Sequence, residues 1–446
     1  MDIQRPDGAP RRHPHNPGSQ QLHGSASLIS ATGTPANGPL ADIPTWPELV
    51  VSPKNTSPAG RSIEKRRIRK HQLLNVIREH GPLSRADIAK ISGYNLPSVS
   101  SLVDELVNDQ IVLEEEARPT SRGRRPIPVL LNHKAATVLG IDLGTSATIG
   151  VLMNLSGEVL CRLETPTPEF PTPDSKADYI VDFAMRVLQR CPEPMAPLAG
   201  VGVGISGLIG TGRPSHQNSV IFEDRFQSLL SERLGVPALV KNDSQMLALG
   251  SLWFGSGAGY ETFAVLNIAE GLGLGFVINR RVYRGAMGFA GDIGHTPMGD
   301  PGIPCYCGNT GCTENVASGN GILRLARQEG LEGIAIPELE RLYYQGDERA
   351  RRIFHRFTEV LGRAVATVVH LYNPEVVIVA GRWAPESAIY FDQLKQESAL
   401  HMRPSLVEST AMFPCKLRED AVPRGSAASV LHHIFSAAHV DLEEVL

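Results

Sequence analysis

The amino-acid sequence predicts a multi-domain α/β protein, in which a small helical module ending in two strands precedes a duplicated α/β unit. Three observations support this fold class. The chain has 446 residues, more than one hydrophobic core usually organises. Apolar residues recur at helical spacing up to about residue 110 and form strand-length runs from residue 137 onward. A similar succession of strands and helices occurs twice in the second part, which indicates two similar halves with a cleft between them.

Residues 1–60 are expected to form a disordered tail. They are rich in Pro, Gly, Ser, Asn and His and cannot bury enough apolar surface to offset their chain entropy. They also lack the apolar stretch of a secretory signal, and no run in the chain approaches the roughly 18 apolar residues of a membrane span. With 42% hydrophobic and 20% charged residues, the composition favours a cytoplasmic protein without a membrane partner.

Charge is distributed unevenly along the chain, although the net charge is only −4. Residues 61–132 carry 13 Lys and Arg against 9 Asp and Glu, whereas residues 133–446 carry 26 against 34. A basic segment attached to an acidic body is typical of a nucleic-acid-binding module joined to a metabolite-binding module. A solvated basic face is the simpler alternative.

Three short helices are expected between Arg61 and Gln110. Gly81 ends the first helix, Ser84 can cap the second, Gly93 closes it, and Asn95 opens the turn into the third. This order is typical of a helix-turn-helix, although a plain three-helix bundle would give the same pattern. Small hydroxyl and amide side chains at the start of the third helix suit contact with DNA bases or phosphates. The candidate DNA-binding residues of these helices are Arg85, Asn95, Ser98, Ser100 and Ser101.

Two strands after these helices indicate a wing. Ile111 to Leu113 and Ile127 to Leu131 are short apolar runs, and the segment between them contains Arg122, Arg124 and Arg125 beside a glycine and a proline. Arginines on such an extended segment suit insertion into a narrow, strongly negative minor groove. Further Lys and Arg residues on the first helix suit non-specific phosphate contacts. We therefore expect residues 61–132 to form a winged helix-turn-helix that binds DNA.

The body is expected to contain two strand meanders, each followed by helices and further strands. The elements of the first half are the strands Thr137–Leu143, Ala147–Asn154 and Val159–Glu164, the helix Ser175–Arg190, the strand Leu198–Ile205, the helix Phe222–Leu234 and the strand Ala238–Val240. Those of the second half are the strands Phe263–Ile268, Gly273–Asn279 and Arg281–Tyr283, several helical stretches and the strand Val376–Ala380.

A cluster of metal-ligand residues is the most specific local motif. His295, Cys305, Cys307 and Cys312 follow the spacing H-x9-C-x-C-x4-C in a Gly- and Pro-rich stretch that can bring them together. Three of the six cysteines lie within eight residues in a chain without an export signal. This pattern favours a metal ion over free thiols or a disulfide.

Polar motifs also stand at the ends of predicted strands. Asp142 lies in the run Gly140 to Thr145, where a strand turns tightly into the next one. Asn242 and Asp243 follow the strand that begins at Ala238 and precede a helix, a position where ligands gather in open α/β sheets. A simple helix N-cap is the alternative interpretation of this pair.

Taken together, these motifs resemble the ROK family (repressors, open reading frames and kinases), and in particular its repressor branch, which includes xylose and N-acetylglucosamine repressors. The resemblance covers roughly residues 61–437. It implies a winged helix followed by an actin-like, ribonuclease H-like sugar kinase fold. Residues 133–250, completed by a helix at about 424–437, would form one subdomain, and residues 251–423 the other. It also implies that the metal is a structural Zn²⁺, because four protein ligands leave no open position.

The resemblance further implies a sugar site in the cleft. Asp243 matches the residue that deprotonates the sugar hydroxyl in the kinases, and His295 could offer its second nitrogen to a sugar. Carboxylates and amides suit this task because each can bond adjacent hydroxyls. The implied sugar-binding residues are Asn218, Asn242, Asp243, Asp292, His295 and Glu314.

Three departures from the kinase pattern argue against catalysis. Ser146 and Ala147 replace the second glycine and the residue after it in the first motif, and Glu270 stands where the kinases bind phosphate. Arg382 and Trp383 replace a glycine-rich adenosine loop. No catalytic residue is therefore expected, and the chain is not expected to be an enzyme.

The sequence thus predicts a sugar-responsive transcriptional regulator. The favoured direction of the response is repression that sugar binding relieves. Its expected partners are operator DNA, a sugar or sugar derivative, and a second copy of the chain in a homodimer or a dimer of dimers. An ATP-dependent sugar kinase with an accessory DNA-binding domain is the main alternative. A DNA-binding protein of purely architectural role, without a ligand, is a third.

Overall fold

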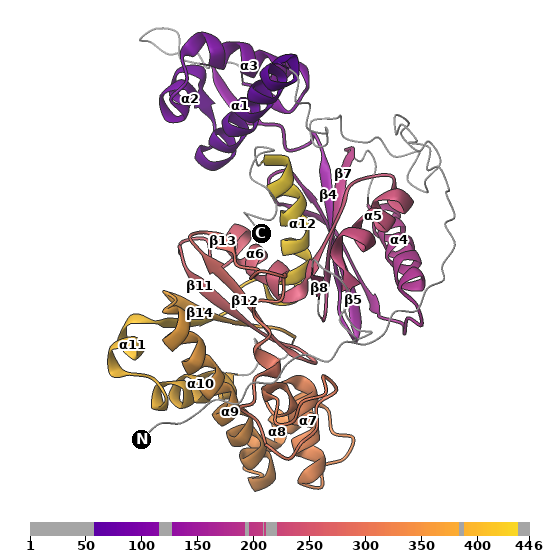
Figure 1. Ribbon diagram of the computed structural model, residues 1–446, viewed down its shortest axis with the longest axis vertical. Coiled ribbons are helices and arrows are strands. Elements are labelled where there is room, and N and C mark those ends of the chain that lie inside the picture. Colours follow the sequence, from indigo (N-terminus) through magenta and orange to yellow (C-terminus); the bar gives the residue numbers. More distant parts are fainter. Residues whose placement is uncertain are drawn as a thin grey trace, which may run out of the picture. The chain divides into compact units, whose positions relative to one another are not determined.

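The structure is a computed structural model that describes residues 58–115, 127–191, 196–207, 209–210, 221–382 and 388–435. Its first part contains three helices and a small antiparallel sheet of order β1-β3-β2 (Figure 1). The helix α1 begins at Pro58, so the expected boundary of the tail at residue 60 falls inside this helix. The elements are α1 (Pro58–His80), β1 (Leu83–Ser84), α2 (Arg85–Ser92), α3 (Leu96–Asn108), β2 (Val112–Glu114) and β3 (Pro128–Leu131).

The helix boundaries in this part follow the signals in the sequence. Ser84 caps α2 in a reciprocal arrangement with Asp87, and Gly93 ends the helix in the left-handed conformation with φ of 74°. Asn95 caps α3 by accepting a hydrogen bond from the backbone N–H of Ser98. These three expectations are confirmed.

Two five-stranded sheets form the body, and both have the same strand order. In each sheet the first strand lies centrally, with an antiparallel meander on one side and two parallel strands on the other. This repetition agrees with the expected duplication. The first sheet, β10-β7-β4-β5-β6, comprises β4 (Thr137–Leu143), β5 (Ala147–Asn154), β6 (Val159–Pro166), β7 (Leu198–Ile205) and β10 (Ala238–Asn242). The second, β13-β12-β11-β14-β15, comprises β11 (Phe263–Ile268), β12 (Leu272–Ile278), β13 (Arg281–Val282), β14 (Val376–Ala380) and β15 (Ala411–Pro414).

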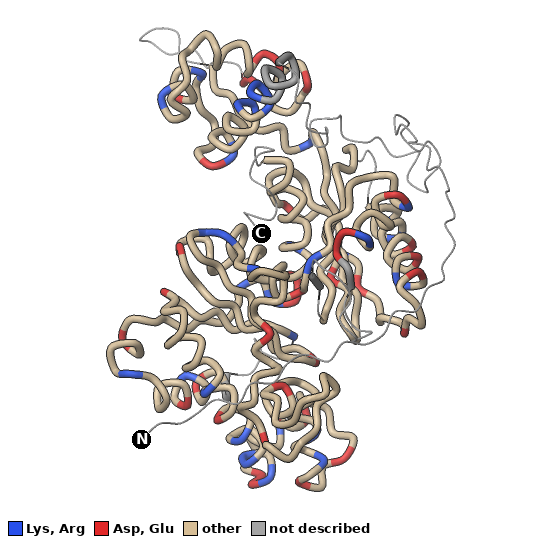
Figure 2. Tube along the Cα trace, in the orientation of Figure 1, with Lys and Arg blue, Asp and Glu red and all other residues tan. Residues whose placement is uncertain are grey.

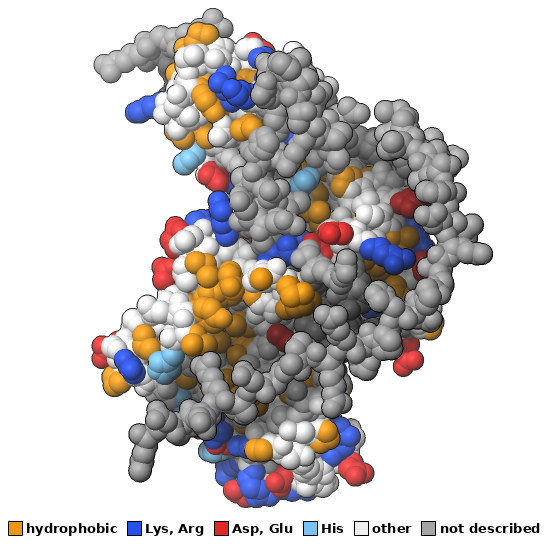
Figure 3. Space-filling view, viewed as in Figure 1, with side chains coloured by type: hydrophobic (Ala, Val, Ile, Leu, Met, Phe, Trp, Pro, Cys, Tyr) orange, Lys and Arg blue, Asp and Glu red, His pale blue; other side chains and the backbone are white. Residues whose placement is uncertain are grey.

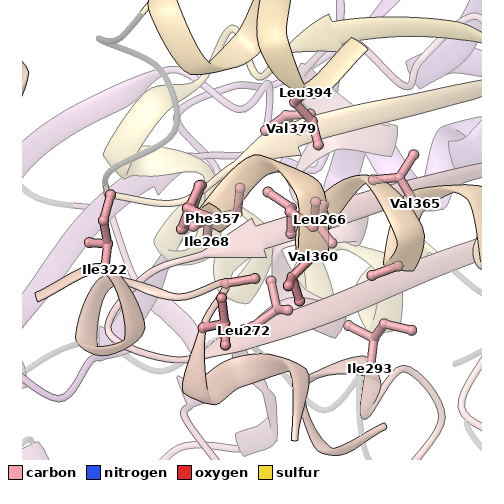
Figure 4. Packing of buried hydrophobic residues seen from close by; sticks show 14 of the residues in the cluster. Leu266, Ile268, Leu272, Ile293, Ile322, Phe357, Val360, Val365, Val379 and Leu394 are labelled. Atoms are coloured by element: carbon pink, nitrogen blue, oxygen red, sulfur yellow. The ribbon is translucent and has the colours of Figure 1, made fainter. Parts of the chain in front are cut away.

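Helices cover both sheets and bury their apolar faces. The long helix α9 contributes Phe357, Val360 and Val365 to a core against β11, β12 and β14, which contribute residues such as Leu266 (Figure 4). The helices of the body are α4 (Pro173–Arg190), α5 (Glu223–Leu234), α6 (Asp243–Phe254), α7 (Gly319–Gln328), α8 (Ile336–Tyr344), α9 (Glu348–Tyr372), α10 (Ala388–Leu400), α11 (Pro404–Ser409) and α12 (Ala421–Phe435). Short elements complete the body: β8 (Ile209–Gly210), β9 (Ile221–Phe222), and the 3₁₀ turns η1 (Ile293–His295), η2 (Thr313–Asn315) and η3 (Arg418–Asp420).

Helix α12 returns from the second half to pack against the first sheet and against α6. Glycines allow this approach: a Cβ on Gly140 of β4 would lie 1.9 Å from the carbonyl oxygen of Pro423. A Cβ on Gly425 of α12 would lie 1.7 Å from the carbonyl oxygen of Met246 in α6. Side chains are excluded at such contacts, so the backbones pack directly on one another. Within the described ranges, no helix combines the length and the apolar content that crossing a bilayer requires.

Candidate functional site

A cleft of about 1020 Å³ is lined by residues from both halves of the body. Its walls come from the β4–β5 turn, the start of α6, the β11–β12 turn and the segment that contains η1 and η2. Five of the six candidate sugar-binding residues line it, and Asn218 lies outside the described residues. The five are Asn242, Asp243, Asp292, His295 and Glu314.

Asn242 and Asp243 stand where β10 ends and α6 begins. The Asn242 side chain is the N-cap: its Oδ1 accepts the backbone N–H groups of Ser244 and Gln245 at 3.0 and 3.3 Å, while its Nδ2 donates to the carbonyl of Gly207 at 3.0 Å. Asp243 Oδ1 accepts the N–H of Ser244 at 2.6 Å. The capping interpretation therefore holds for Asn242, and both residues also line the cleft.

A buried ion cluster lies directly behind this corner. Lys241 and Arg284 both donate to the carboxylate of Glu223, and all three side chains are buried. Burial lowers the pKa of Lys241, while Glu223 opposes that shift. Since Lys241 immediately precedes Asn242, the cluster fixes the end of β10.

Carboxylate side chains crowd the end of the cleft near the β4–β5 and β11–β12 turns. Burial, followed by the charges of Asp243 and Glu270, raises the pKa of Asp142 well above its usual value. Burial also raises the pKa of Asp243. Ser146 donates to Glu270 across the cleft, and Arg382 Nη1 donates to the hydroxyl of Ser146 at 3.3 Å. The sequence identified Glu270 as unfavourable for phosphate but gave no sign of this network, because its members are more than one hundred residues apart.

The four candidate metal ligands meet in one cluster, with their ligand atoms all within 4.8 Å of one another. Cys307 Sγ lies 3.6 Å from Cys312 Sγ, and Cys305 Sγ lies 3.6 Å from His295 Nδ1. Two ligands about 2.3 Å from a tetrahedral Zn²⁺ would be about 3.7 Å apart, whereas disulfide sulfurs are about 2 Å apart. The donor set and its spacing therefore fit a zinc ion.

Local turns bring these ligands together. The backbone N–H of Cys305 donates to Asn309 at 2.8 Å, and that of Gly308 donates to Cys305 at 3.0 Å. Gly308 and Gly311 adopt φ of 94° and 73°, which a side chain would strain. The tight turn places Cys305, Cys307 and Cys312 beside His295.

Beside the cluster lies a group of polar side chains that face the cleft. His295 Nε2 lies 3.1 Å from the hydroxyl of Tyr306, and Glu314 accepts the backbone N–H of Leu272 at 2.9 Å. Asp292 Oδ1 lies 4.0 Å from His295 Nε2. Tyr306 as a whole is 80% exposed, but the loss of water around its hydroxyl group inside the cleft, together with the charge of Glu314, raises its pKa. Sequence reasoning missed Tyr306, although its position between two metal ligands was a usable signal.

The candidate DNA-binding residues of α2 and α3 differ in their surroundings. Asn95 and Ser101 are exposed, whereas Ser98 and Ser100 are partly buried. Arg85 is paired within the helical part, 2.7 Å from Asp104 and 2.8 Å from Glu114. Arg122, Arg124 and Arg125 lie outside the described residues.

A second hollow, of about 560 Å³, lies between α1 and the start of α3. It combines three cationic side chains of α1 with hydroxyl groups of α3, and Figure 2 shows several Lys and Arg residues on α1. Arg66 donates to Ser101 at 3.0 Å and pairs with Glu105. The residues that line it are Lys65, Arg66, Arg69, Pro97, Ser98, Ser101 and Leu102.

Comparison with known proteins identifies the family to which this fold belongs. The model of the ROK family matches residues 138–433, which is more than half of the chain. The chain belongs to the ROK family. Among curated relatives, the xylose repressor of Bacillus spizizenii is 27% identical over 374 residues, which cover 82% of this chain and 96% of that protein.

Two further relatives have names that concern transcription. The DNA-binding transcriptional dual regulator NagC of Escherichia coli is 26% identical over 318 residues, covering 69% of this chain and 78% of that protein. The crystal structure of a ROK family transcriptional regulator, a homologue of the Escherichia coli MLC protein, aligns with a TM-score of 0.72 at 23% identity. It covers 84% of this chain and 98% of that structure, and at this identity it shows a shared mixed α/β fold.

Proposed function

We propose that this ROK family protein is a sugar-responsive, DNA-binding transcriptional regulator, acting as a repressor of genes for carbohydrate metabolism or uptake in the cytoplasm. The observation that carries the proposal is the cleft, which gathers Asn242, Asp243, Asp292, His295 and Glu314 from separate elements. Amides and carboxylates in such a cleft suit a polyhydroxylated ligand. The names of the curated relatives support the regulatory role.

DNA binding is assigned to residues 61–132, acting as a winged helix-turn-helix. Helix α3 would enter the major groove with Asn95, Ser98, Ser100 and Ser101 at its leading end, and the hollow beside it would take a phosphate. Arg85, which is paired with Asp104 and Glu114, would position α3 in this arrangement. Arg122, Arg124 and Arg125 of the wing are assigned to the minor groove from the sequence alone.

Zinc is the proposed cofactor, held by His295, Cys305, Cys307 and Cys312. With four protein ligands the ion would have a structural role and would fix the loop that carries Tyr306. His295 binds the ion through Nδ1 in this arrangement, so its Nε2 remains directed toward Tyr306 and the cleft.

Phosphoryl transfer is not part of the proposed function. Glu270 places a carboxylate where a phosphate would lie, and Arg382 and Ser146 are bonded into the same network. A sugar kinase is the second candidate, because Asp243, the counterpart of the kinase base, does line the cleft. Sugar-dependent consumption of ATP by the purified protein would favour the kinase.

Helix α6 offers a route from the sugar to the DNA-binding part. It begins at Asp243 and spans roughly 18 Å to its last turn. There the guanidinium of Arg78 from α1 lies 4.5 Å from the centre of the Trp253 ring. A shift of α6 on sugar binding would therefore change the position of α1.

Helix α12 provides a second contact at the same place. His71 Nδ1 donates to the carbonyl of Ile434 at 2.7 Å, and Asn75 Nδ2 donates to that of Phe435 at 2.6 Å. Since α12 packs directly on α6, both helices would reposition α1 together. Sugar binding would then weaken operator binding by changing how the recognition helices of a dimer are spaced.

A homodimer, or a dimer of dimers, is proposed because a regulator of this kind reads paired half-sites. Figure 3 shows hydrophobic side chains gathered at the surface over the second sheet. An exposed apolar patch is the kind of surface that a second copy would bury.

The proposal is tested by fluorescence anisotropy with DNA from upstream of the protein's own gene, at fixed salt, with a panel of sugars. At least one sugar is expected to weaken DNA binding about tenfold or more.

Asp243→Asn should weaken sugar binding by about 10- to 100-fold, because hydrogen bonds to a charged group contribute about 1.5–3 kcal/mol. Asp224→Asn, an exposed acid on α5, is the matched control and should leave sugar binding unchanged. DNA affinity indifferent to every sugar would contradict the proposal.

A further inference from the structure

The charges that line the cleft are strongly unbalanced. Among the described lining residues, carboxylates outnumber guanidinium groups by six to two, and lysine is absent from that set. The carboxylates are Asp142, Asp243, Glu270, Asp292, Glu314 and Glu419, and the guanidinium groups are Arg382 and Arg418. An anionic group on the ligand would therefore meet like charges from several sides.

The two arginines do not offset this excess. Arg382 donates to Ser146, lies 3.9 Å from Glu164, and is close enough to Asp142 to lower that carboxyl's pKa against the larger opposing effects. Arg418 is exposed and is followed directly by the acidic residue Glu419. Both cations thus stand beside carboxylates of the protein.

Helix N-termini are the other usual binding sites for phosphate, and two of them face the cleft. At α6 the N–H groups of Ser244 and Gln245 already donate to Asn242, and that of Ser244 also donates to Asp243. A phosphate at this end would have to displace the protein's own carboxylate and amide.

The backbone N–H groups at the N-terminus of α7 are also already bonded within the protein. The N–H groups of Gly319 and Asn320 donate to the carbonyls of Ala269 and Glu270 at 2.7 and 3.1 Å, and that of Gly321 donates to the hydroxyl of Ser318 at 3.0 Å. The first backbone donors of α7 are thus already bonded within the protein.

From these observations we infer that the effector is an uncharged sugar, bound through its hydroxyl groups, and that the same sugar carrying a phosphate or another anionic group is rejected. This inference rests on the proposed function and specifies the chemical class of its ligand. The acceptor-rich lining suits hydroxyl groups, which can donate to carboxylates. Rejection arises because a buried anion without a cationic partner is costly.

The test compares matched pairs of probes on the full chain: glucose with glucose 6-phosphate, N-acetylglucosamine with its 6-phosphate, and xylose with xylose 5-phosphate. Binding is measured by titration calorimetry, and operator release by anisotropy. The neutral member of at least one pair should bind and release operator, and its phosphate ester should bind at least tenfold more weakly. Tighter binding by the ester would overturn the inference while leaving a sugar-responsive regulator intact. If no member of any pair binds or alters operator affinity, the proposed function fails and the inference with it.

A charge variant provides a second readout. Glu270→Gln removes one carboxylate from the cleft. It should reduce the difference in binding affinity between a neutral sugar and its phosphate ester by severalfold. Glu261→Gln changes an exposed acid outside the cleft lining and should leave this difference in affinity unchanged. The electrostatic basis of the inference would be overturned if the ester bound as tightly as its sugar and Glu270→Gln left the two affinities in the same ratio.

Discussion

Cys312 is fully buried, and its sulfur lies within the cluster formed by His295, Cys305 and Cys307. A buried thiol makes few contacts with water, so Cys312 would contribute to the fold mainly through the proposed zinc ion. The adjacent Thr313 and Glu314 belong to the turn η2, so loss of the ion would also disturb the wall of the cleft. The proposed metal site and the wall of the cleft are therefore expected to be linked at this position.

Cys312→Ser is therefore expected to lower zinc affinity on the order of 100-fold or more and to lower the thermal midpoint of unfolding. Zinc content after competition with a chelator, measured by mass spectrometry, checks the first effect. Cys161→Ser, on β6 and outside the cluster, should retain about one zinc ion per chain. Wild-type protein purified without zinc would show that the assignment is wrong.

At the residue scale, sequence reasoning located the metal cluster and five sugar-site candidates, because ligand spacing and strand-end motifs are local signals. It could not find the contact of Ser146 with Glu270 and Arg382, since pairing across the cleft depends on how the two halves fold together. Arg85 was assigned to DNA from its place in the helix-turn-helix pattern, and its pairing with Asp104 and Glu114 became visible only in three dimensions. Asn218 and the wing arginines stay predictions.

Among the secondary-structure elements, the pair α6 and α12 is important for the proposed function because it joins the cleft at Asp243 to the contact with α1. Their close packing depends on Gly250 and Gly425, where a Cβ would lie 2.4 Å and 1.7 Å from backbone carbonyl oxygens. These distances are too short for any side chain. The backbones of the two helices therefore pack directly on one another.

Gly425→Ala should destabilise the body by about 1–3 kcal/mol or more, because the added methyl group forces the backbones of α6 and α12 apart. Urea unfolding followed by circular dichroism measures this change. Gly302→Ala is the control: a Cβ there meets no atom within 4 Å, and its φ is not positive. Equal stability of the two variants would contradict direct backbone packing between the helices.

Most strands and helices of the body were predictable from apolar runs, because strands such as β7 and β14 are buried along their whole length. Four strands were missed for physical reasons. β1, β8 and β9 have only two residues each, too few for a pattern, and β15 is a partly exposed edge strand that ends at Pro414. Its residues therefore lack the alternation that marks a half-buried strand.

For the whole molecule, the proposed effect of sugar on DNA binding depends on the contacts of α1 with Trp253 and with the end of α12. Arg78→Met combined with Asn75→Leu removes the cation–π contacts of Arg78 with Trp253 and Phe435 and the hydrogen bond of Asn75 to Phe435, while retaining much of the side-chain volume. We expect unchanged sugar affinity but a sugar effect on operator binding reduced to less than about threefold. Calorimetry and anisotropy on the same preparation measure both quantities.

The control for this double variant is Arg186→Met on α4, which removes a comparable guanidinium from above the ring of Phe183 in the first half of the body. It should keep the full effect of sugar on operator binding. An undiminished effect in the α1 double variant would show that the signal takes another path. The sequence predicted the two halves and the basic N-terminal part, but not this route, because it depends on the packing of three helices that are far apart in the chain.

The four candidate metal ligands lie within residues 295–312, whereas the first half of the body is complete only when α12, which ends at Phe435, has packed against β4 and α6. If these ligands hold the proposed ion, it could be captured during synthesis before the last helix completes the cleft.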